Sequence, residues 1–276
     1  MKYGLFLPPF DGLADAHRMA DLAVLAEESG WDGFFVWDHL RYLPPVREIL
    51  DPYICLAVMA SRTSRITLGP MVTPLNRRRP QVVARQALSL DWLSRGRLVM
   101  GFGIGDDYPG GDLACFGEVT DAHTRGRVLD EGIVLFESLT SGRRVNYVGE
   151  HFRAEEVEYL PCAYRDEGIA VWTAGRWPNQ APIRRAARHQ GMMVIEMTEP
   201  EQMLELSSSL IEAGADLDHF DIALWGQRDT KLQFRPDTRY EEWSEAGVAW
   251  FLTGPGPFNL DYGEVRDYVA AGPMQD

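Results

Sequence analysis

Residues Arg97 to Asp106 read RLVMGFGIGD, and this stretch decides the fold. Its centre, Leu98-Val99-Met100, is apolar without alternation, which suits a strand covered on both faces, as in parallel sheets. A helix-like segment with apolar residues at helical spacing precedes it, beginning near Pro80 and ending at Gly96. The stretch therefore predicts one step of a repeat in which parallel strands alternate with helices.

The same step recurs along the whole chain of 276 residues. Eight runs rich in apolar, β-branched or aromatic residues are each followed by a helix-like stretch: Tyr3–Pro8, Gly33–Trp37, Ile66–Thr73, Arg97–Gly103, Ile169–Ala174, Gly191–Ile195, Phe220–Leu224 and Gly247–Leu252. Parallel strands need crossover connections, and eight such units close into a barrel coated by helices. We therefore expect an α/β fold, a (β/α)₈ TIM barrel, formed by a single domain that spans residues 1–276.

Two longer segments interrupt this repeat. About thirty residues, Thr140 to Gly168, separate the fourth helix from the fifth strand. Within them, two short alternating runs flank Gly149-Glu150, which predicts a β-hairpin inserted between strands 4 and 5, outside the barrel. The second segment, Asp106 to Asp121, follows the fourth strand. Long loops in a compact domain are more often lids or binding segments than loops without a function.

The composition restricts the partners and the compartment. With 27 basic and 41 acidic side chains the net charge is −14, which disfavours binding to nucleic acid or anionic membranes. No apolar run approaches the roughly 20 residues of a membrane span, and the chain enters a strand at once, without a basic-then-apolar leader. Three widely spaced cysteines without a C-x-x-C pair are expected to be reduced thiols. We expect a cytoplasmic protein that acts on a small molecule.

A barrel of this kind carries its chemistry at the carboxyl ends of its strands. Trp37-Asp38-His39 ends the second strand, and a histidine there can exchange protons near neutral pH. The alternative for His39 is to cap a neighbouring backbone carbonyl. Asp106 presents a carboxylate at the end of the fourth strand. Since Glu196 is the one further candidate metal ligand at these ends, a metal-dependent hydrolase is disfavoured and no metal site is expected.

Three other strand ends suit a flat molecule that carries a phosphate. The run from Gly69 to Pro74 contains prolines, which cannot donate hydrogen bonds to a neighbouring strand. The run therefore predicts a bulge at the end of this central strand. Gly103 and Gly105 would let the backbone approach a ring system closely. The run Thr173-Ala174-Gly175-Arg176-Trp177 precedes a helix, so its N–H groups and its arginine predict an anion site. Arg77–Arg79 are a second candidate anion site, unless they pair with acidic residues.

At these residues the chain resembles the luciferase-like superfamily of flavin- and deazaflavin-dependent oxidoreductases. The resemblance runs from Lys2 to about Gly272, and its carriers are Tyr3–Pro8, Trp37-Asp38-His39, Leu68–Pro74, Leu90–Leu98 with its glycine tail, and Ala174–Asn179. It implies a TIM barrel with an insertion near the fourth and fifth strands. It also implies a flavin or deazaflavin at the carboxyl mouth of the barrel, and a homodimer.

The resemblance leaves two branches of chemistry open. One branch uses coenzyme F420 for hydride transfer, and the other uses reduced FMN and molecular oxygen. His39 and Asp106 resemble the acid/base partners of the F420 branch, so we expect F420-dependent hydride transfer to or from a small organic substrate. The alternative is a reduced-FMN-dependent monooxygenase, although Ile104 stands where some luciferases carry an arginine. The substrate stays open, because Leu43 replaces an aromatic residue of the deazaflavin sugar dehydrogenases and Asp106 is shorter than their acid.

The resemblance also implies cofactor contacts and one backbone feature. A non-prolyl cis peptide bond is expected between Pro70 and Met71, behind the central ring of the cofactor. The expected cofactor-binding residues are Asp38, Pro70, Met71, Val72, Thr73, Gly103, Gly105, Thr173, Ala174, Gly175, Arg176 and Trp177. A third hypothesis is a barrel that binds a flavin without catalysis, and the presence of His39 and Asp106 argues against it.

Overall fold

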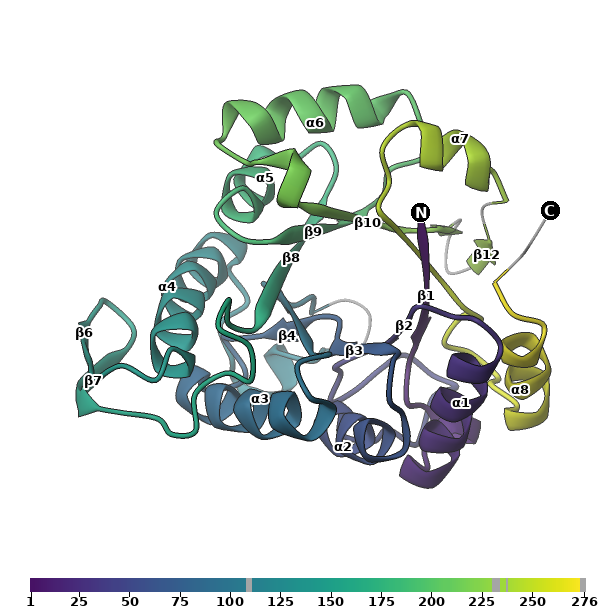
Figure 1. Cartoon of the computed structure of the whole chain (residues 1–276), viewed down its shortest axis with the longest axis horizontal. Helices are drawn as coiled ribbons and strands as arrows, with labels where there is room; N and C mark the ends of the chain where they lie inside the picture. The colour runs from purple at the N-terminus through teal and green to yellow at the C-terminus, as the bar shows by residue number, and fades with distance from the viewer. Residues whose placement is uncertain (108–110, 230–233, 237, 274–276) are drawn as a thin grey trace.

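The computed structural model describes residues 1–107, 111–229, 234–236 and 238–273, and most of its strands join one parallel sheet. Around that sheet the order is β3 (Thr67–Pro70), β2 (Gly33–Val36), β1 (Lys2–Leu7), β13 (Trp250–Thr253), β10 (Asp221–Trp225), β9 (Gly191–Ile195), β8 (Ala170–Arg176), β5 (Val99–Gly103) and β4 (Thr73–Pro74). A parallel bridge between Leu68 and Leu98 brings the two ends of the sheet together, so it curves into a nearly closed ring (Figure 1). The predicted barrel is confirmed.

Helices surround this ring of strands (Figure 1). They are α1 (Ala16–Glu28), α2 (Pro52–Arg62), α3 (Pro80–Ser94), α4 (Ala122–Thr140), α5 (Gln180–Ala186), α6 (Gln202–Glu212), α7 (Tyr240–Glu245) and α8 (Tyr262–Ala270), with short 3₁₀ turns η1 (Asp11–Leu13), η2 (Ala114–Phe116) and η3 (Leu217–His219). Aspartates fix the starts of four of the helices, because the side chains of Asp15, Asp51, Asp121 and Asp261 each accept hydrogen bonds from first-turn N–H groups. None of the described helices combines the length and the apolarity that a membrane crossing requires.

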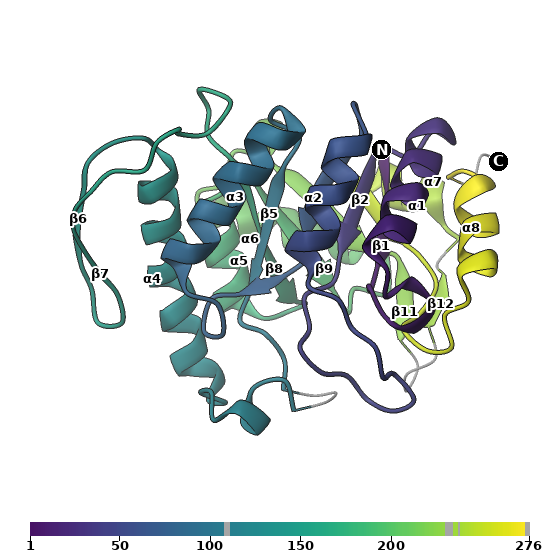
Figure 2. The same cartoon turned by 90° about the horizontal axis from the view of Figure 1, so that it is seen from below.

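Two small antiparallel hairpins lie apart from the barrel sheet. Between α4 and β8, β6 (Val145–Val148) pairs with β7 (Arg153–Val157), and Figures 1 and 2 show this hairpin on the outer side of α4. After β10, β11 (Gln227–Asp229) pairs with β12 (Phe234–Pro236).

Glycines make room for large rings inside the barrel. The rings of Phe35, Trp172 and Trp250 meet with centroids 5.5, 5.7 and 5.6 Å apart. A Cβ on Gly33 would stand 2.7 Å from Trp250, and one on Gly191 would stand 2.5 Å from Trp172. Because Trp172 and Trp250 sit near the amino ends of β8 and β13, these rings fill that end of the barrel, and the cavity described below lies toward the other end.

Candidate active site

A cavity of about 1360 Å³ opens at the carboxyl ends of the barrel strands. Its walls come from the ends of β1 and β10, from the segments that follow β2, β5, β8 and β9, and from the first turns of α4 and α5. The long segments after β2 and β5 lie together below the strands in Figure 2. No group of three or more His, Cys, Asp or Glu side chains that could hold a metal ion occurs in the part of the chain that the structure describes.

Most of the candidate catalytic and cofactor-binding residues predicted from the sequence line this one cavity. They are Asp38, His39, Met71, Val72, Gly103, Gly105, Asp106, Ala174, Gly175 and Arg176. Four nominated residues are not part of the lining: Pro70, Thr73, Thr173 and Trp177. Thr73 and Thr173 are fully buried, and the Trp177 side chain packs against the apolar cluster under α5 and α6.

The bulge at the end of β3 forms the floor of the cavity. The expectation of a cis bond between Pro70 and Met71 is wrong by one residue, because the non-prolyl cis bond joins Met71 to Val72. The reason is register: Pro70 still pairs with Val36, and the Met71 N–H donates to the Val36 carbonyl at 2.8 Å. The chain therefore follows the parallel ladder through Met71 and leaves it only afterwards.

The glycines of β5 are needed by this bulge. A Cβ on Gly101 would stand 2.4 Å from Met71 Sδ, and one on Gly103 would stand 2.5 Å from Val72 Cγ2. Gly105 has a φ of +73°, a conformation that side chains disfavour. Backbone packing thus explains these glycines, in addition to the close approach of a ring that their pattern suggested.

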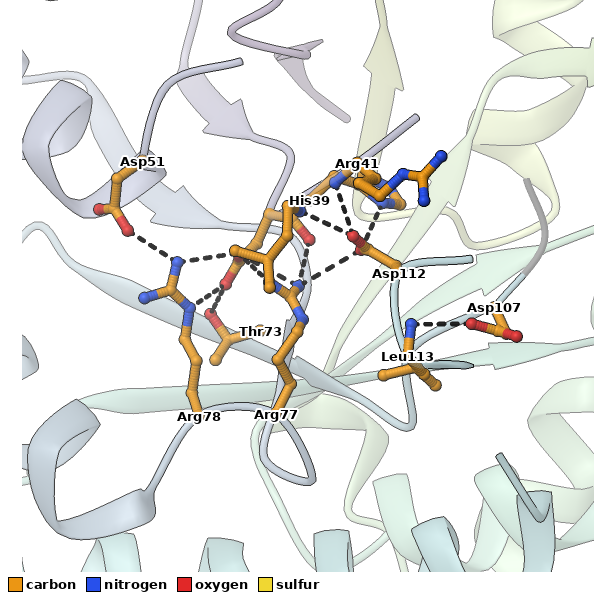
Figure 3. Close-up of polar contacts among 12 residues, drawn as sticks. His39, Arg41, Asp51, Thr73, Arg77, Arg78, Asp107, Asp112 and Leu113 are labelled. Carbon is orange, nitrogen blue, oxygen red and sulfur yellow. Dashed lines mark hydrogen bonds and ion pairs between the residues drawn. The ribbon is translucent and has the colours of Figure 1, made fainter. Parts of the chain in front are cut away.

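His39 is held by a carboxylate that the sequence analysis missed. Its Nδ1 lies 3.0 Å from Asp112 Oδ2, while the N–H groups of Leu40 and Arg41 donate to Asp112 Oδ1 at 2.8 and 2.7 Å (Figure 3). Asp107 fixes the loop that delivers Asp112, because its Oδ1 accepts from the N–H groups of Leu113 and Ala114. With Nδ1 engaged, Nε2 is the ring nitrogen that remains for a substrate in the cavity.

The Asp112 carboxyl is nearly buried, and its pKa lies below the ordinary value of 3.8. Burial acts to raise that pKa, but the hydrogen bond from His39, the charge of His39 and the charge of Arg77 outweigh burial. Asp112 is therefore ionised at neutral pH, and its carboxylate can accept a hydrogen bond from Nδ1 of His39. No periodic pattern marks a single aspartate in a sixteen-residue loop (106–121), which is why the sequence did not reveal it.

Asp38, the residue before His39, is bound by two arginines. Its carboxylate accepts from Arg78 at 2.8 and 3.0 Å and from Arg77 at 3.3 Å, and Thr73 Oγ1 donates to it at 3.1 Å (Figure 3). Arg78 also pairs with Asp51, the N-cap of α2, at 2.8 Å. Arg77 and Arg78 therefore pair with acidic residues, which leaves the alternative anion site at Arg77–Arg79 without its first two members.

Arg176 bridges two carboxylates across the rim of the cavity. Its guanidinium pairs with Asp106 at 2.8 Å and also pairs with Glu196, and about half of its side chain is exposed. The Trp177 N–H donates to the Ile195 carbonyl at 2.9 Å, because Ala174, Gly175 and Arg176 continue β8 in register with β9. An anion at this strand end would therefore meet Arg176 more readily than the N–H group of Trp177.

A second set of cations lines the cavity at the start of α4, where the sequence analysis nominated no residue. Arg125 is nearly buried and donates from Nη1 to the carbonyls of Ile104 and Gly105 at 3.0 and 2.5 Å. Its buried Nε has no hydrogen-bond partner among the described residues. Arg127 and His123 line the same end. Arg125 is the fourth residue of α4, where a positive charge opposes the helix dipole, and that unfavourable placement was the available signal of a function.

Aromatic side chains line the opposite end of the cavity. Phe6, Trp37, Tyr42 and Trp225 come from the ends of β1, β2 and β10 and from the β2–α2 segment. The Tyr42 ring lies 5.2 Å from the His39 ring, so an aromatic side chain stands beside His39 although Leu43 is aliphatic.

Comparison with known proteins finds a family model and several relatives that match this chain. The family model described as luciferase-like monooxygenase matches residues 1–231. The chain is 28% identical over 229 residues to an F420-dependent glucose-6-phosphate dehydrogenase of Microbacterium testaceum, covering 80% of this chain and 65% of that protein. It is 33% identical over 163 residues to an F420-dependent hydroxymycolic acid dehydrogenase of Mycobacterium tuberculosis, covering 57% of this chain and 44% of that protein.

A solved structure shares the fold over nearly the whole chain. The coenzyme F420-dependent tetrahydromethanopterin reductase from Methanopyrus kandleri superposes with a TM-score of 0.77 over 98% of both chains, at 18% identity. The chain spans 65% and 44% of the lengths of the two sequence relatives.

Proposed function

The chain belongs to the luciferase-like monooxygenase family, and from this premise we propose that it transfers a hydride between coenzyme F420 and a small organic substrate. The observation that carries the proposal is the hydrogen-bonded pair of His39 and Asp112 beside the aromatic end of the cavity. Hydride transfer to or from a carbon–oxygen bond needs a proton donor or acceptor at the oxygen, and this pair supplies one. The names of the F420-dependent relatives support the choice of cofactor.

The residues of the cavity fit a deazaflavin with an anionic tail. Met71, Val72, Gly103, Ala174 and Gly175 offer an apolar floor on which a flat ring can lie. Arg125, whose buried Nε has no partner in the described part of the chain, lies at one end of that floor, and the nominated Arg176 lies at the rim. Charge-assisted contacts from such groups would hold a phosphodiester. Pro70, Thr73 and Thr173 would act from behind this floor. Asp38, in the lining, would act through its bonds to Arg77 and Arg78, and Trp177 would anchor the β8–α5 turn.

The chain's own part in the reaction is to position the substrate and to move a proton. The bound cofactor supplies a carbon that accepts or donates the hydride. When an alcohol is oxidised, its carbon–hydrogen electron pair leaves with the hydrogen, and its hydroxyl proton passes to His39 Nε2. Asp112 stabilises the imidazolium that results. Asp106, which pairs with Arg176 at the rim, would steady charge on the other side of the reacting bond.

Reduced-FMN-dependent oxygenation is the alternative, and the family description itself favours it. A titration with each cofactor distinguishes F420-dependent from FMN-dependent chemistry, because a deazaflavin absorbs at about 420 nm and oxidised FMN at about 450 nm. We expect the purified protein to bind F420 at least tenfold more tightly than FMN. Tighter binding of FMN, with oxygen uptake in the presence of its reduced form, would contradict the proposal.

We also propose a cytoplasmic homodimer. Exposed apolar side chains on two adjacent helices, Ile54 on α2 and Val82 and Trp92 on α3, support a self-association face. The three cysteines Cys55, Cys115 and Cys162 are free, which suits a reducing compartment. Sedimentation equilibrium tests the dimer: Val82→Glu should shift the protein toward the monomer, and a wild-type monomer at micromolar concentration would refute the proposal.

A further inference from the structure

We infer that the substrate is an uncharged alcohol or ketone that carries an aromatic or other bulky apolar group. The inference rests on the proposed hydride transfer at His39 and concerns the end of the cavity around that residue. We call this end the aromatic arm, and its walls are Phe6, Trp37, Tyr42 and Trp225.

The rings of the aromatic arm form one connected wall. Phe6 lies 5.2 Å from Trp37 and 5.7 Å from Trp225, and Trp37 lies 5.9 Å from Trp225, measured between ring centroids. The two contacts of Trp225 are edge-to-face, at 87° and 89°, a preferred geometry for aromatic pairs. The wall is therefore held in shape by its own packing, and it presents ring surface to whatever occupies this end.

The order of the strands separates this wall from the floor proposed for the cofactor. Phe6, Trp37 and Trp225 end β1, β2 and β10, which lie in the sector β2-β1-β13-β10 of the ring. The floor comes from β4, β5 and β8 and from the bulge before β4, which occupy another sector. His39 follows β2, so it stands where the aromatic sector meets the floor. A substrate that reacts beside His39 must therefore extend along the rings.

The charges near this wall are already paired with one another. Arg77, whose side chain is 4% exposed, lies 3.3 Å from Asp38 and 3.7 Å from Asp112. A phosphate group beside His39 would face the carboxylates of Asp38 and Asp112, and Arg77 could turn to it only by leaving them. The other arginines of the described lining, Arg125, Arg127, Arg176 and Arg185, lie away from this wall, on α4, β8 and α5. A sugar phosphate is therefore the wrong class of substrate for the aromatic arm.

The size of the effect follows from apolar burial. Each methylene group that moves from water to an apolar wall favours binding about fourfold, so a phenyl ring should outweigh a methyl group by well over tenfold. Removing one ring from the wall should abolish most of the preference for a phenyl ring over a methyl group.

Calorimetric titration with three named probes tests the inference: acetophenone, acetone and glucose 6-phosphate, each added to the protein alone and to the protein with F420. We expect acetophenone to bind at least tenfold more tightly than acetone. Trp225→Ala should weaken acetophenone binding at least tenfold. Tyr164→Ala is the matched control, because Tyr164 is an exposed aromatic residue and is not part of the lining. Tyr42→Leu serves as a second variant in case Trp225→Ala does not fold.

The outcomes separate this inference from the proposed function. Acetophenone binding that depends on Trp225 or Tyr42 supports the aromatic arm even if F420 fails to bind, in which case hydride transfer alone is refuted. Turnover of glucose 6-phosphate with F420, or binding of glucose 6-phosphate in preference to acetophenone, overturns the inference and leaves hydride transfer intact. Acetophenone affinity that is equal in the wild type and in a folded variant of the wall also overturns it.

Discussion

At the scale of single residues, the proposed acid–base chemistry depends on Asp112 as well as on His39. Asp112→Asn keeps the shape of the side chain but removes its charge, so it should lower kcat about ten- to a hundredfold and leave F420 affinity unchanged. His39→Ala should lower kcat by about 10²–10⁴-fold. Steady-state kinetics at several pH values measures both effects.

A purely structural role for Asp112 would give a different pattern. The Asp112→Asn enzyme should lose activity with a displaced pH profile, because the imidazole no longer has a carboxylate partner. Asp166→Asn is the matched control, since Asp166 is an exposed surface carboxylate outside the cavity lining. Equal loss of kcat at every pH would assign Asp112 to loop folding alone.

We expect Arg176 to bind the anionic group of the cofactor. Since a charge-assisted hydrogen bond contributes about 1.5–3 kcal/mol, Arg176→Ala should raise the F420 dissociation constant roughly ten- to a hundredfold. Fluorescence titration of the variant against wild type measures this constant. If Arg176→Ala binds F420 normally while Arg127→Ala does not, the anion lies at the start of α4 and the assignment to the end of β8 is wrong.

At the scale of elements, the contact between the β3–β4 bulge and β5 shapes the floor. Gly103→Ala would place a Cβ 2.5 Å from Val72 Cγ2, so the bulge must move. Overpacking of this kind costs about 1–3 kcal/mol, and the displaced floor should also weaken F420 binding. Thermal unfolding measures the loss of stability, and cofactor titration measures the loss of F420 affinity. Gly263→Ala on α8 is the matched control, because Gly263 has no positive φ, an added Cβ would meet only Asp261 Oδ1 at 3.0 Å, and Gly263 is not part of the cavity lining. Normal F420 affinity in Gly103→Ala would show that the ring lies elsewhere.

Another element-scale contact predicts the acid sensitivity of the fold. The Glu27 carboxylate, at the end of α1, accepts from the N–H groups of Ser64, Arg65 and Ile66 before β3. Burial acts to raise its pKa, but these hydrogen bonds outweigh burial and lower the pKa from 4.5 to about 2. A lowered folded-state pKa means that this stabilisation is complete above pH 4.5 and is lost as the pH falls toward 2.

Glu27→Ala should therefore lower the free energy of unfolding at pH 7 by about 1–3 kcal/mol, since three N–H groups lose their acceptor. The difference from wild type should shrink as the pH drops from 4.5 toward 2. Chemical denaturation at several pH values measures it. A difference that stays constant over that range would show that the carboxylate charge does not contribute.

At the scale of the whole molecule, the sequence was enough to predict the barrel and the end that carries the cavity. Apolar runs such as Leu98-Val99-Met100 and glycine stops such as Gly96 are local signals, and eight repetitions leave little choice of topology. Strand-end residues such as His39 and Gly175 follow from the same logic, because the carboxyl ends of parallel strands converge.

Contacts between distant segments could not be predicted in this way. Asp112 and His39 pair although they are 73 residues apart in the sequence. Arg77 and Arg78 pair with Asp38, which lies about forty residues before them. The position of the cis bond depends on how far β3 stays in register with β2, which periodicity does not encode. Such features depend on tertiary contacts, so they emerge only once the barrel is folded.

Following the hydrogen that moves tests the central claim most directly. A secondary alcohol deuterated at its carbinol carbon, such as 1-phenylethanol, is incubated with the protein and oxidised F420 without oxygen, and the reduced cofactor is analysed by mass spectrometry and NMR. Hydride transfer predicts one deuterium on the ring carbon of the reduced deazaflavin for each ketone formed, and a His39→Ala enzyme that makes far less of it. The claim is contradicted if no deuterium reaches F420 and product forms only with reduced FMN, at one oxygen consumed per product.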